Sequence, residues 1–225
     1  MGQDETEMPD TPLEEVRGKI AKMCKIARRE PEDVTLIAVS KTHPPERILA
    51  LLEQGHRVFG ENRVQEAQGK WPALREQFPD VELHLIGQLQ SNKADDAVEL
   101  FDCIHGLDRP SLLKALAKAM DKADKRVPCF IQVNIGEEQQ KGGCAIGDVP
   151  DMIAKARAAD IPVAGLMCLP PAGIEPAPFF ALLHKLAQDN GLTGLSMGMS
   201  GDYETAVQLG ATHVRVGTAL FGARG

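Results

Sequence analysis

The chain has 225 residues, of which 43% are hydrophobic and 25% charged, a composition typical of one ordinary globular domain. Its 25 Lys and Arg residues and 32 Asp and Glu residues give a formal net charge of −7, which argues against nucleic acid as a partner. No apolar run approaches the ~18 residues of a membrane span, and the acidic start MGQDETEMPD lacks the order of a secretion signal, so we expect no membrane association.

The N-terminal region divides into a polar leader and a helix. Residues 1–11 are acidic and carry no basic patch, which predicts a disordered leader before a single domain over residues 12–225. The segment 13–30 has apolar residues at three- and four-residue spacing, which predicts an amphipathic helix that Pro31 ends. The periodic residues are Val16, Ile20, Met23 and Ala27.

Short apolar, β-rich runs then alternate with helical patterns along the rest of the chain. The predicted strands cover residues 34–40, 57–62, 81–87, 101–108, 127–135, 162–169, 194–198 and 212–218. The predicted helices between them cover residues 46–55, 63–77, 89–98, 110–124, 149–160, 177–190 and 202–209. Eight such units in about 200 residues predict an α/β fold, a single closed (β/α)8 TIM barrel.

The end of the chain bears on how such a barrel would close. Only residues 219–225 follow the eighth predicted strand, too few for an eighth helix in its usual place. We therefore expect the N-terminal helix before strand one to cover the gap, with no second domain. The alternative is an open doubly wound sheet, which normally has a glycine-rich turn after its first strand. This chain has Lys41, Thr42, His43 and Pro44 at that place.

Lys41 is the first candidate for chemistry, because the active site of this type of barrel lies at the C-terminal ends of the strands. Taken alone, a lysine at a strand end is most often a solvated surface residue. Its position directly after a fully apolar run places it at the barrel mouth, where desolvation favours the neutral amine. A neutral amine can form an imine with a carbonyl group.

Two loops of small residues follow strands seven and eight, where barrels frequently bind phosphate. The first loop holds Ser200 and Gly201, with Ser200 a candidate N-cap of the helix 202–209, and the second holds Gly217 and Thr218. For either loop alone, glycines that merely make turns are the better explanation. The two loops together favour a phosphate site.

Alternation along the eighth strand places His213 and Arg215 on one face and two valines on the other. The valines suit the helix layer, so Arg215 should face the barrel interior near its mouth. A buried arginine needs an acceptor, either a lone pair of a ligand or a nearby carboxylate. An imine-forming lysine, a phosphate cradle and an inward arginine suggest a phosphorylated aldehyde, and pyridoxal 5′-phosphate (PLP) fits all three.

Several motifs together make the sequence resemble a known family. They are VSKTHPPERI (39–48), FGENRVQEA (59–67), HLIGQLQSNK (84–93), VNIGEEQQKGG (133–143), GLMC (165–168), SMGMSGDYETAV (196–207) and RVGTALFG (215–222). On these motifs the chain resembles, from about Leu36 to Gly222, the pyridoxal phosphate homeostasis protein family, whose fold is similar to the barrel domain of alanine racemase. The resemblance implies a protein of vitamin B6 homeostasis that buffers and delivers PLP, bound as a lysine imine (Schiff base), without substrate turnover.

The resemblance also implies roles for individual residues. Lys41 resembles the imine lysine and Arg215 the partner of the pyridine nitrogen. The residues that resemble phosphate contacts are Ser200, Gly217 and Thr218, and those that resemble residues lining the ring are Asn62, His84 and Met167. The full cofactor-binding set that we expect is Lys41, Asn62, His84, Met167, Ser200, Gly201, Arg215, Gly217 and Thr218.

Three residues depart from the family pattern. Arg63 stands where an aromatic residue is usual, Gln88 where proline is usual, and Gly142 where serine is usual. None of them falls on the imine or phosphate positions. They leave open the rim of the mouth and any partner that docks there, and a secondary cofactor site at Lys141 also stays open.

A carrier and an enzyme make different demands on the chain. Racemisation needs two acid/base groups, and Lys41 supplies one. The single tyrosine, Tyr203, starts the helix behind the phosphate loop, which predicts a position on the wrong side. An arginine at the pyridine nitrogen also discourages its protonation and weakens the ring as an electron sink. We expect a carrier; the alternatives are a fold-type III PLP enzyme such as an amino-acid racemase, and a Schiff-base aldolase.

The five cysteines are an odd number and widely spread, with no C-x-x-C and no histidine at ligand spacing. This pattern predicts reduced thiols in the cytoplasm and argues against a zinc site. We expect a monomer whose partners are PLP and apo forms of PLP-dependent enzymes.

Overall fold

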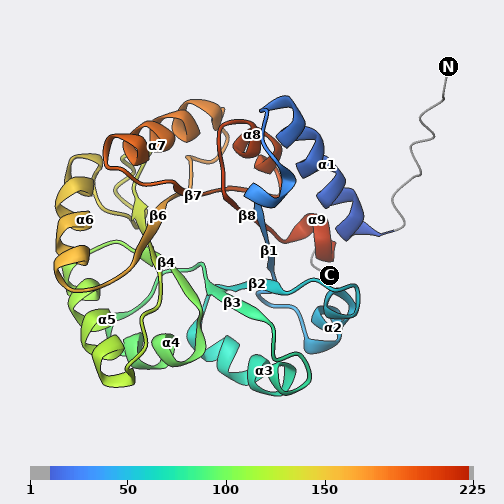
Figure 1. Cartoon of the computed structure of the whole chain (residues 1–225), viewed down its shortest axis with the longest axis horizontal. Coiled ribbons are helices and arrows are strands. Elements are labelled where there is room, and N and C mark those ends of the chain that lie inside the picture. Colours follow the sequence, from blue (N-terminus) through green and yellow to red (C-terminus); the bar gives the residue numbers. More distant parts are fainter. Residues whose placement is uncertain (1–10, 223–225) are drawn as a thin grey trace.

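The computed structural model describes residues 11–222, which form a closed barrel of eight parallel strands (Figure 1). The strands are β1 (Thr35–Val39), β2 (Val58–Glu61), β3 (Glu82–Leu85), β4 (Cys103–Leu107), β5 (Cys129–Val133), β6 (Val163–Cys168), β7 (Gly194–Met199) and β8 (His213–Val216). Each strand pairs with its neighbour in sequence, and β8 pairs with β1 to close the barrel. The predicted (β/α)8 barrel is confirmed, and the open sheet is wrong. The predicted leader, apart from Thr11, lies outside the described residues.

Helices form an outer ring around the strands (Figure 1). They are α1 (Pro12–Ile26), α2 (Pro45–Glu53), α3 (Val64–Gln77), α4 (Ala94–Leu100), α5 (Pro110–Ala123), α6 (Val149–Ala158), α7 (Ala177–Asp189), α8 (Tyr203–Gln208) and α9 (Thr218–Phe221). Single 3-10 turns cover Pro31–Asp33, Ser91–Lys93 and Ile146–Asp148. Every predicted strand and helix is present, with ends that differ by a few residues.

Helix α1 ends at Ile26, before the predicted stop at Pro31. Arg28 takes the left-handed backbone conformation, with φ of 56°, and the N–H of Arg29 donates to the carbonyl of Cys24 at 2.9 Å. This turn satisfies a carbonyl of the last helical turn and reverses the chain. Local capping therefore ends the helix before the proline does.

Helix α1 covers the side of the barrel where a full eighth helix would lie, as predicted. It packs beside α8 and α9 (Figure 1). A single helical turn, α9, does form after β8, so the eighth strand ends at Val216 and Thr218 already belongs to a helix. The face of α1 that packs inward consists of Leu13, Val16, Ile20, Met23 and Cys24.

Apolar side chains fill the layer between the strands and the helices, and the largest that are fully buried include Trp71, Phe59, Phe101 and Phe180. The barrel interior holds a smaller apolar cluster of Cys103, Phe130 and Met167, together with buried polar side chains. The polar side chains of the strands are thus available to build a site along the barrel axis.

Strand β7 bends sharply at its C-terminal end. Gly198 has φ of 94°, a conformation that favours glycine, and a Cβ there would lie 2.6 Å from the Cβ of Ala206. The pairing of β7 with β8 shifts register between Ser196 and Met199. This bend carries the following loop, with Ser200, to the barrel mouth.

Candidate functional site

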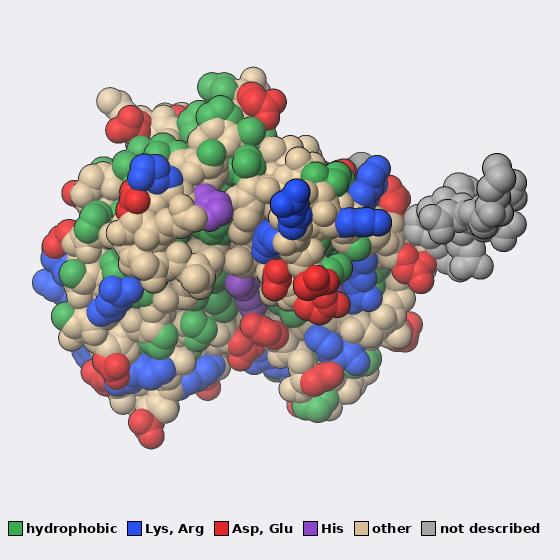
Figure 2. Space-filling model, turned by 45° about the horizontal axis from the view of Figure 1, so that its top comes forward, with side chains coloured by type: hydrophobic (Ala, Val, Ile, Leu, Met, Phe, Trp, Pro, Cys, Tyr) green, Lys and Arg blue, Asp and Glu red, His purple; other side chains and the backbone are tan. Residues whose placement is uncertain are grey.

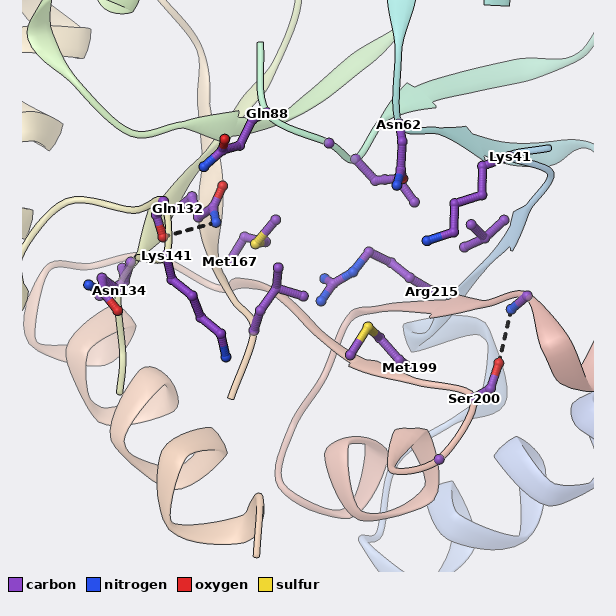
Figure 3. A pocket seen from close by; sticks show the side chains of 18 of the residues that line it. Lys41, Asn62, Gln88, Gln132, Asn134, Lys141, Met167, Met199, Ser200 and Arg215 are labelled. Carbon is purple, nitrogen blue, oxygen red and sulfur yellow. Dashed lines mark hydrogen bonds between the residues drawn. The ribbon is translucent and has the colours of Figure 1, made fainter. Parts of the chain in front are cut away.

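A cavity of about 530 Å³ lies at the C-terminal ends of the strands, within the size range of small-molecule sites. Figure 3 shows Lys41 and Ser200 on one side of it and Gln88, Gln132 and Lys141 across from them. Of the nine predicted site residues, all but His84 line the cavity: Lys41, Asn62, Met167, Ser200, Gly201, Arg215, Gly217 and Thr218.

Lys41 is the second residue after β1, which ends at Val39, and it is half-buried. Its side chain lies along the cavity and its amine points into it (Figure 3). Among the residues that the structure describes, this amine has no hydrogen-bond or ion-pair partner. It is therefore free to react with or bind a ligand.

A buried ion pair holds the loop that carries Lys41. The carboxylate of Glu61 is fully buried and accepts from the ammonium of Lys70 and from the hydroxyl of Ser40, both at 2.7 Å. The indole N–H of Trp71 donates to the same oxygen at 3.1 Å. Lys70 also donates to the carbonyl of Ser40 at 3.1 Å. These bonds fix the backbone just before Lys41 and so direct its side chain.

The two small-residue loops meet at the barrel mouth. The N–H of Gly217 donates to the hydroxyl of Ser200 at 3.1 Å. Ser200 is therefore not the N-cap that we expected, because its hydroxyl is turned across to β8; Asp202 is the N-cap of α8. Gly201 and Thr218 are exposed beside this bond. The hydroxyls of Ser200 and Thr218 can both donate to an anion.

Arg215 is buried inside the barrel and reaches the floor of the cavity (Figure 3). Its guanidinium donates to the hydroxyl of Ser196 and to the carbonyl of Cys168, the latter at 2.9 Å. Burial lowers the pKa of this guanidinium from its ordinary value. Among the described residues no carboxylate pairs with it, so its charge is left for a ligand.

His84 is the predicted site residue that the structure places elsewhere. It is buried within the barrel, bonded to Glu82 at 2.8 Å and to His105 at 2.9 Å. Alternation places His84 and Ile86 on the same inward face, and the two differ in depth: His84 lies within β3, below the cavity, whereas Ile86, two residues on, lines it.

The residues of the cavity wall opposite Lys41 were not among the predicted site residues. Lys141 had been considered only as an open question, for a secondary cofactor site. The Lys141 ammonium pairs with Glu138 at 2.6 Å and donates to the carbonyl of Pro170 at 3.1 Å. Gln132 and Asn134 are polar residues at the end of the otherwise apolar strand β5, and this pattern could have indicated the wall from the sequence. The polar side chains of this wall are Gln88, Gln132, Asn134, Gln140 and Lys141.

Two of the three departures from the family pattern meet at the rim of this wall. A Cβ on Gly142 would lie 1.8 Å from Nε2 of Gln88, so the Gln88 side chain fills the space of a side chain at 142. The neighbouring Gly143 is constrained differently. It has φ of 121°, and a Cβ there would lie 2.4 Å from the backbone nitrogen of Asn134.

All five cysteines are free and buried. The expectation that none lies near a histidine at ligand spacing is wrong. The ligand atoms of His84, Cys103 and His105 lie within 4.8 Å of one another. Cys103 and His105 stand two residues apart and share one face of β4, a spacing that the sequence already contains. His84 joins them only because β3 pairs with β4, which brings His84 beside Cys103.

On the face shown in Figure 2, acidic and basic side chains are interspersed over the surface. This pattern agrees with the net charge of −7. Within residues 11–222, none of the helices combines the length and the hydropathy needed to cross a membrane.

Comparison with known proteins places this geometry in context. Residues 13–225 match the family model of the alanine racemase N-terminal domain. The chain is 39% identical over 218 residues to the pyridoxal phosphate homeostasis protein of Pseudomonas aeruginosa, covering 94% of each. It is 36% identical over 227 residues to the protein of the same name from Escherichia coli K12, covering 94% of this chain and 95% of that one.

Solved structures agree. The chain is 38% identical in sequence to PipY of Synechococcus elongatus, whose structure was solved with PLP bound. The two structures superpose with a TM-score of 0.80 over 90% of this chain and 100% of PipY. An alanine racemase of Clostridium difficile has a TM-score of 0.71 at 14% identity and covers 94% of this chain but 57% of the racemase. The second likeness concerns the fold alone.

Proposed function

The chain belongs to the pyridoxal phosphate homeostasis protein family, and from this membership we propose that it binds PLP in the cavity at the barrel mouth. Its role is to hold this cofactor and deliver it, without turning over a substrate. The names of the relatives and the PLP bound to PipY support the proposal. The observation that carries it is the Lys41 amine, which faces the cavity with no partner among the described residues.

The chemistry of the cavity fits the three polar parts of this ligand. Lys41 offers an amine to the aldehyde, and the hydroxyls of Ser200 and Thr218, beside the backbone of Gly217, offer donors to the phosphate. Arg215 offers a donor to the lone pair of the ring nitrogen. When bound, the ligand supplies an aldehyde carbon that can form a C=N bond with an amine.

Arg215 favours storage over catalysis. A guanidinium that donates to the ring nitrogen disfavours a second positive charge there, so that nitrogen stays unprotonated. An unprotonated ring is a weak electron sink for amino-acid chemistry. The uncompensated charge of Arg215 thus supports a carrier.

A second acid/base group is also hard to find. Of the described residues that line the cavity, Lys41 and Lys141 are those that could exchange a proton, and Lys141 is held by Glu138. Tyr203 is buried at the start of α8, near Lys19 of α1, and does not line the cavity. With one free base, the cavity is poorly equipped for racemisation, which needs two.

We extend the proposal to the state of the protein: a monomer of the cytoplasm that passes PLP to apo PLP-dependent enzymes. Its free thiols support a reducing compartment. The structure shows few exposed large hydrophobic side chains among the described residues, and of these Ile174 and Met199 line one hollow while the others stand apart on α1 and α7: Ile26, Ile174, Leu182 and Met199. A solution mass of more than one chain would contradict the monomer.

Transfer and turnover measurements test the function together. The loaded protein is mixed with an apo PLP enzyme, whose activity should return. In parallel, incubation with L- or D-alanine should leave the chirality of the amino acid unchanged. Racemisation, decarboxylation or transamination at roughly 1 s⁻¹ or above would overturn the carrier and favour a PLP-dependent racemase or a related enzyme.

A further inference from the structure

A line of hydrogen-bonded side chains runs through the barrel below the cavity. Glu82 Oε1 bonds to His84 Nε2 at 2.8 Å, and His84 Nδ1 bonds to His105 Nε2 at 2.9 Å. His105 Nδ1 bonds to Ser196 Oγ at 2.8 Å, and Ser196 Oγ accepts from Arg215. The line connects β3, β4, β7 and β8, and runs from a half-exposed carboxylate to the guanidinium at the cavity floor.

The proton positions along this line follow from its upper end. Arg215 can only donate, so Ser196 accepts from it and has one proton of its own to give. Among the bonds of the described residues, the acceptor for that proton is Nδ1 of His105. A neutral His105 must then carry its proton on Nε2 and donate to Nδ1 of His84. His84 in turn donates from Nε2 to the carboxylate of Glu82.

Burial and charge support this arrangement. His105 is fully buried, and desolvation lowers the pKa of its imidazole well below the ordinary value, which keeps it neutral. The hydrogen bond from His84 lowers the pKa of Glu82, which keeps that carboxylate ionised. Every bond of the line then has one donor and one acceptor, in a single direction from Arg215 to Glu82.

We propose that Ser196, His105 and His84 are positioning residues, which together fix the orientation in which Arg215 presents its guanidinium to the cavity. Without His105, the Ser196 hydroxyl would be free to rotate, and Arg215 would keep only the carbonyl of Cys168 as a fixed acceptor. The consequence for PLP rests on the proposed function, whereas the directed line belongs to the protein without ligand.

A metal site is the other use that these side chains suggest, because Cys103 lies with His84 and His105 at ligand spacing. However, the facing nitrogens of the two histidines already share a hydrogen bond. Burial also raises the pKa of the Cys103 thiol well above its ordinary value, which disfavours the thiolate that a metal needs. The hydrogen-bonded line therefore accounts for the cluster better.

Nitrogen-15 NMR of the histidine rings in the full chain without ligand tests the line directly. At neutral pH, His105 should be neutral with its proton on Nε2, and the His84 ring should donate from Nε2 to Glu82 while its Nδ1 acts as an acceptor. Ser196→Ala should shift the Nδ1 signal of His105 toward that of a free acceptor and leave His213 unchanged. A proton on Nδ1 of His105, a charged His105, or loss of the His84 and His105 signals on adding one equivalent of Zn²⁺ would overturn the proposal.

PLP titration followed by absorbance tests the link to Arg215. His105→Leu should weaken PLP binding by about tenfold and shift the absorbance band, because a buried donor loses its fixed acceptor. His105→Asn should restore most of the affinity, since its side-chain oxygen can accept from Ser196 in place of Nδ1. In the Arg215→Met background, His105→Leu should have little further effect, whereas additive losses would contradict positioning through Arg215.

His213 supplies a matched control. It is a third histidine of the same interior cluster, in ring contact with His105 and Phe130, but its Nδ1 bonds to Thr212, outside the line. His213→Leu should therefore leave PLP affinity within about twofold. If His105→Leu fails to fold, Ser196→Ala takes its place in the cycle. Absence of PLP binding by the unaltered protein would overturn the proposed function, while the ring tautomers would still decide the line.

Discussion

The barrel interior has an upper half, at the cavity, and a lower half, where the hydrogen-bonded line runs. Both halves contain polar side chains, but these differ in how many partners they have within the protein. In the upper half, Lys41 has no partner among the described residues and Arg215 has no carboxylate beside it. In the lower half, both ring nitrogens of His84 and of His105 are bonded within the protein. The upper half retains binding capacity for a ligand, and the lower half uses its own to order the interior.

This difference shows that residue type alone is a poor guide to a binding site. Two histidines beside a cysteine are stronger candidates by type than one lysine, yet their polar atoms are satisfied. The lysine is a common surface residue, yet its amine is left free at a cavity. Breaking or adding single partners in each half tests the contrast.

The largest effect should come from Lys41→Ala in the upper half. Loss of the amine should weaken PLP binding by about 100-fold or more, equivalent to about 3 kcal/mol. Borohydride reduction and peptide mapping of the unaltered protein should place the label on Lys41. Lys141→Ala is the control, because its ammonium is already paired with Glu138 and should matter much less. Equal losses in the two variants, or a label on another lysine, would refute the assignment.

Acid should lower the free energy of unfolding through His213, a histidine of the lower half. Burial lowers the pKa of His213 from its ordinary 6.5 to about 4, so the folded protein resists a proton that the unfolded chain accepts. Its contribution to the free energy of unfolding is complete above pH 6.5 and is lost as the pH falls toward 4, by up to about 3 kcal/mol. Denaturant titrations of His213→Gln at several pH values should show a shallower loss of stability in acid, and an unchanged slope would argue against a neutral His213 in the folded protein.

A smaller effect should separate the phosphate from the rest of the ligand. Ser200→Ala and Thr218→Val each remove one hydroxyl donor, which should cost about 1–2 kcal/mol of binding. The loss should be selective, with PLP weakened much more than unphosphorylated pyridoxal in matched titrations. If both ligands weaken equally, these loops do not hold the phosphate.

The smallest effect should come from Gly142→Ser at the rim. The closest atoms to the new Cβ would belong to the flexible end of the exposed Gln88 side chain, which can rotate away, while Oδ2 of Asp108 would lie at 3.4 Å, an ordinary contact. The free energy of unfolding should therefore change by less than about 0.5 kcal/mol. Gly143→Ala is the contrast, because its φ of 121° and its contact with the Asn134 backbone allow no such escape. Similar thermal unfolding of both variants would show that the rim is softer than the structure indicates.

Sequence patterns predicted the parts of the molecule that depend on local periodicity. The barrel followed from alternating strands and helices, Lys41 from its position after the first strand, and the inward direction of Arg215 from alternation along the eighth strand. His84 was misplaced because interior depth depends on the stagger between strands, which one sequence does not contain. The role of Ser200 was misjudged because its hydroxyl bonds to Gly217, 17 residues away.

The single tryptophan of the chain gives the protein an internal optical reporter. Trp71 is fully buried and shares the carboxylate of Glu61 with Ser40, the residue that precedes Lys41. Its emission therefore arises from one fixed site that is coupled through two hydrogen bonds to the backbone of the cavity. A chromophoric ligand at Lys41 would accept excitation energy from this indole, so that loading and release could be followed in real time on unlabelled protein.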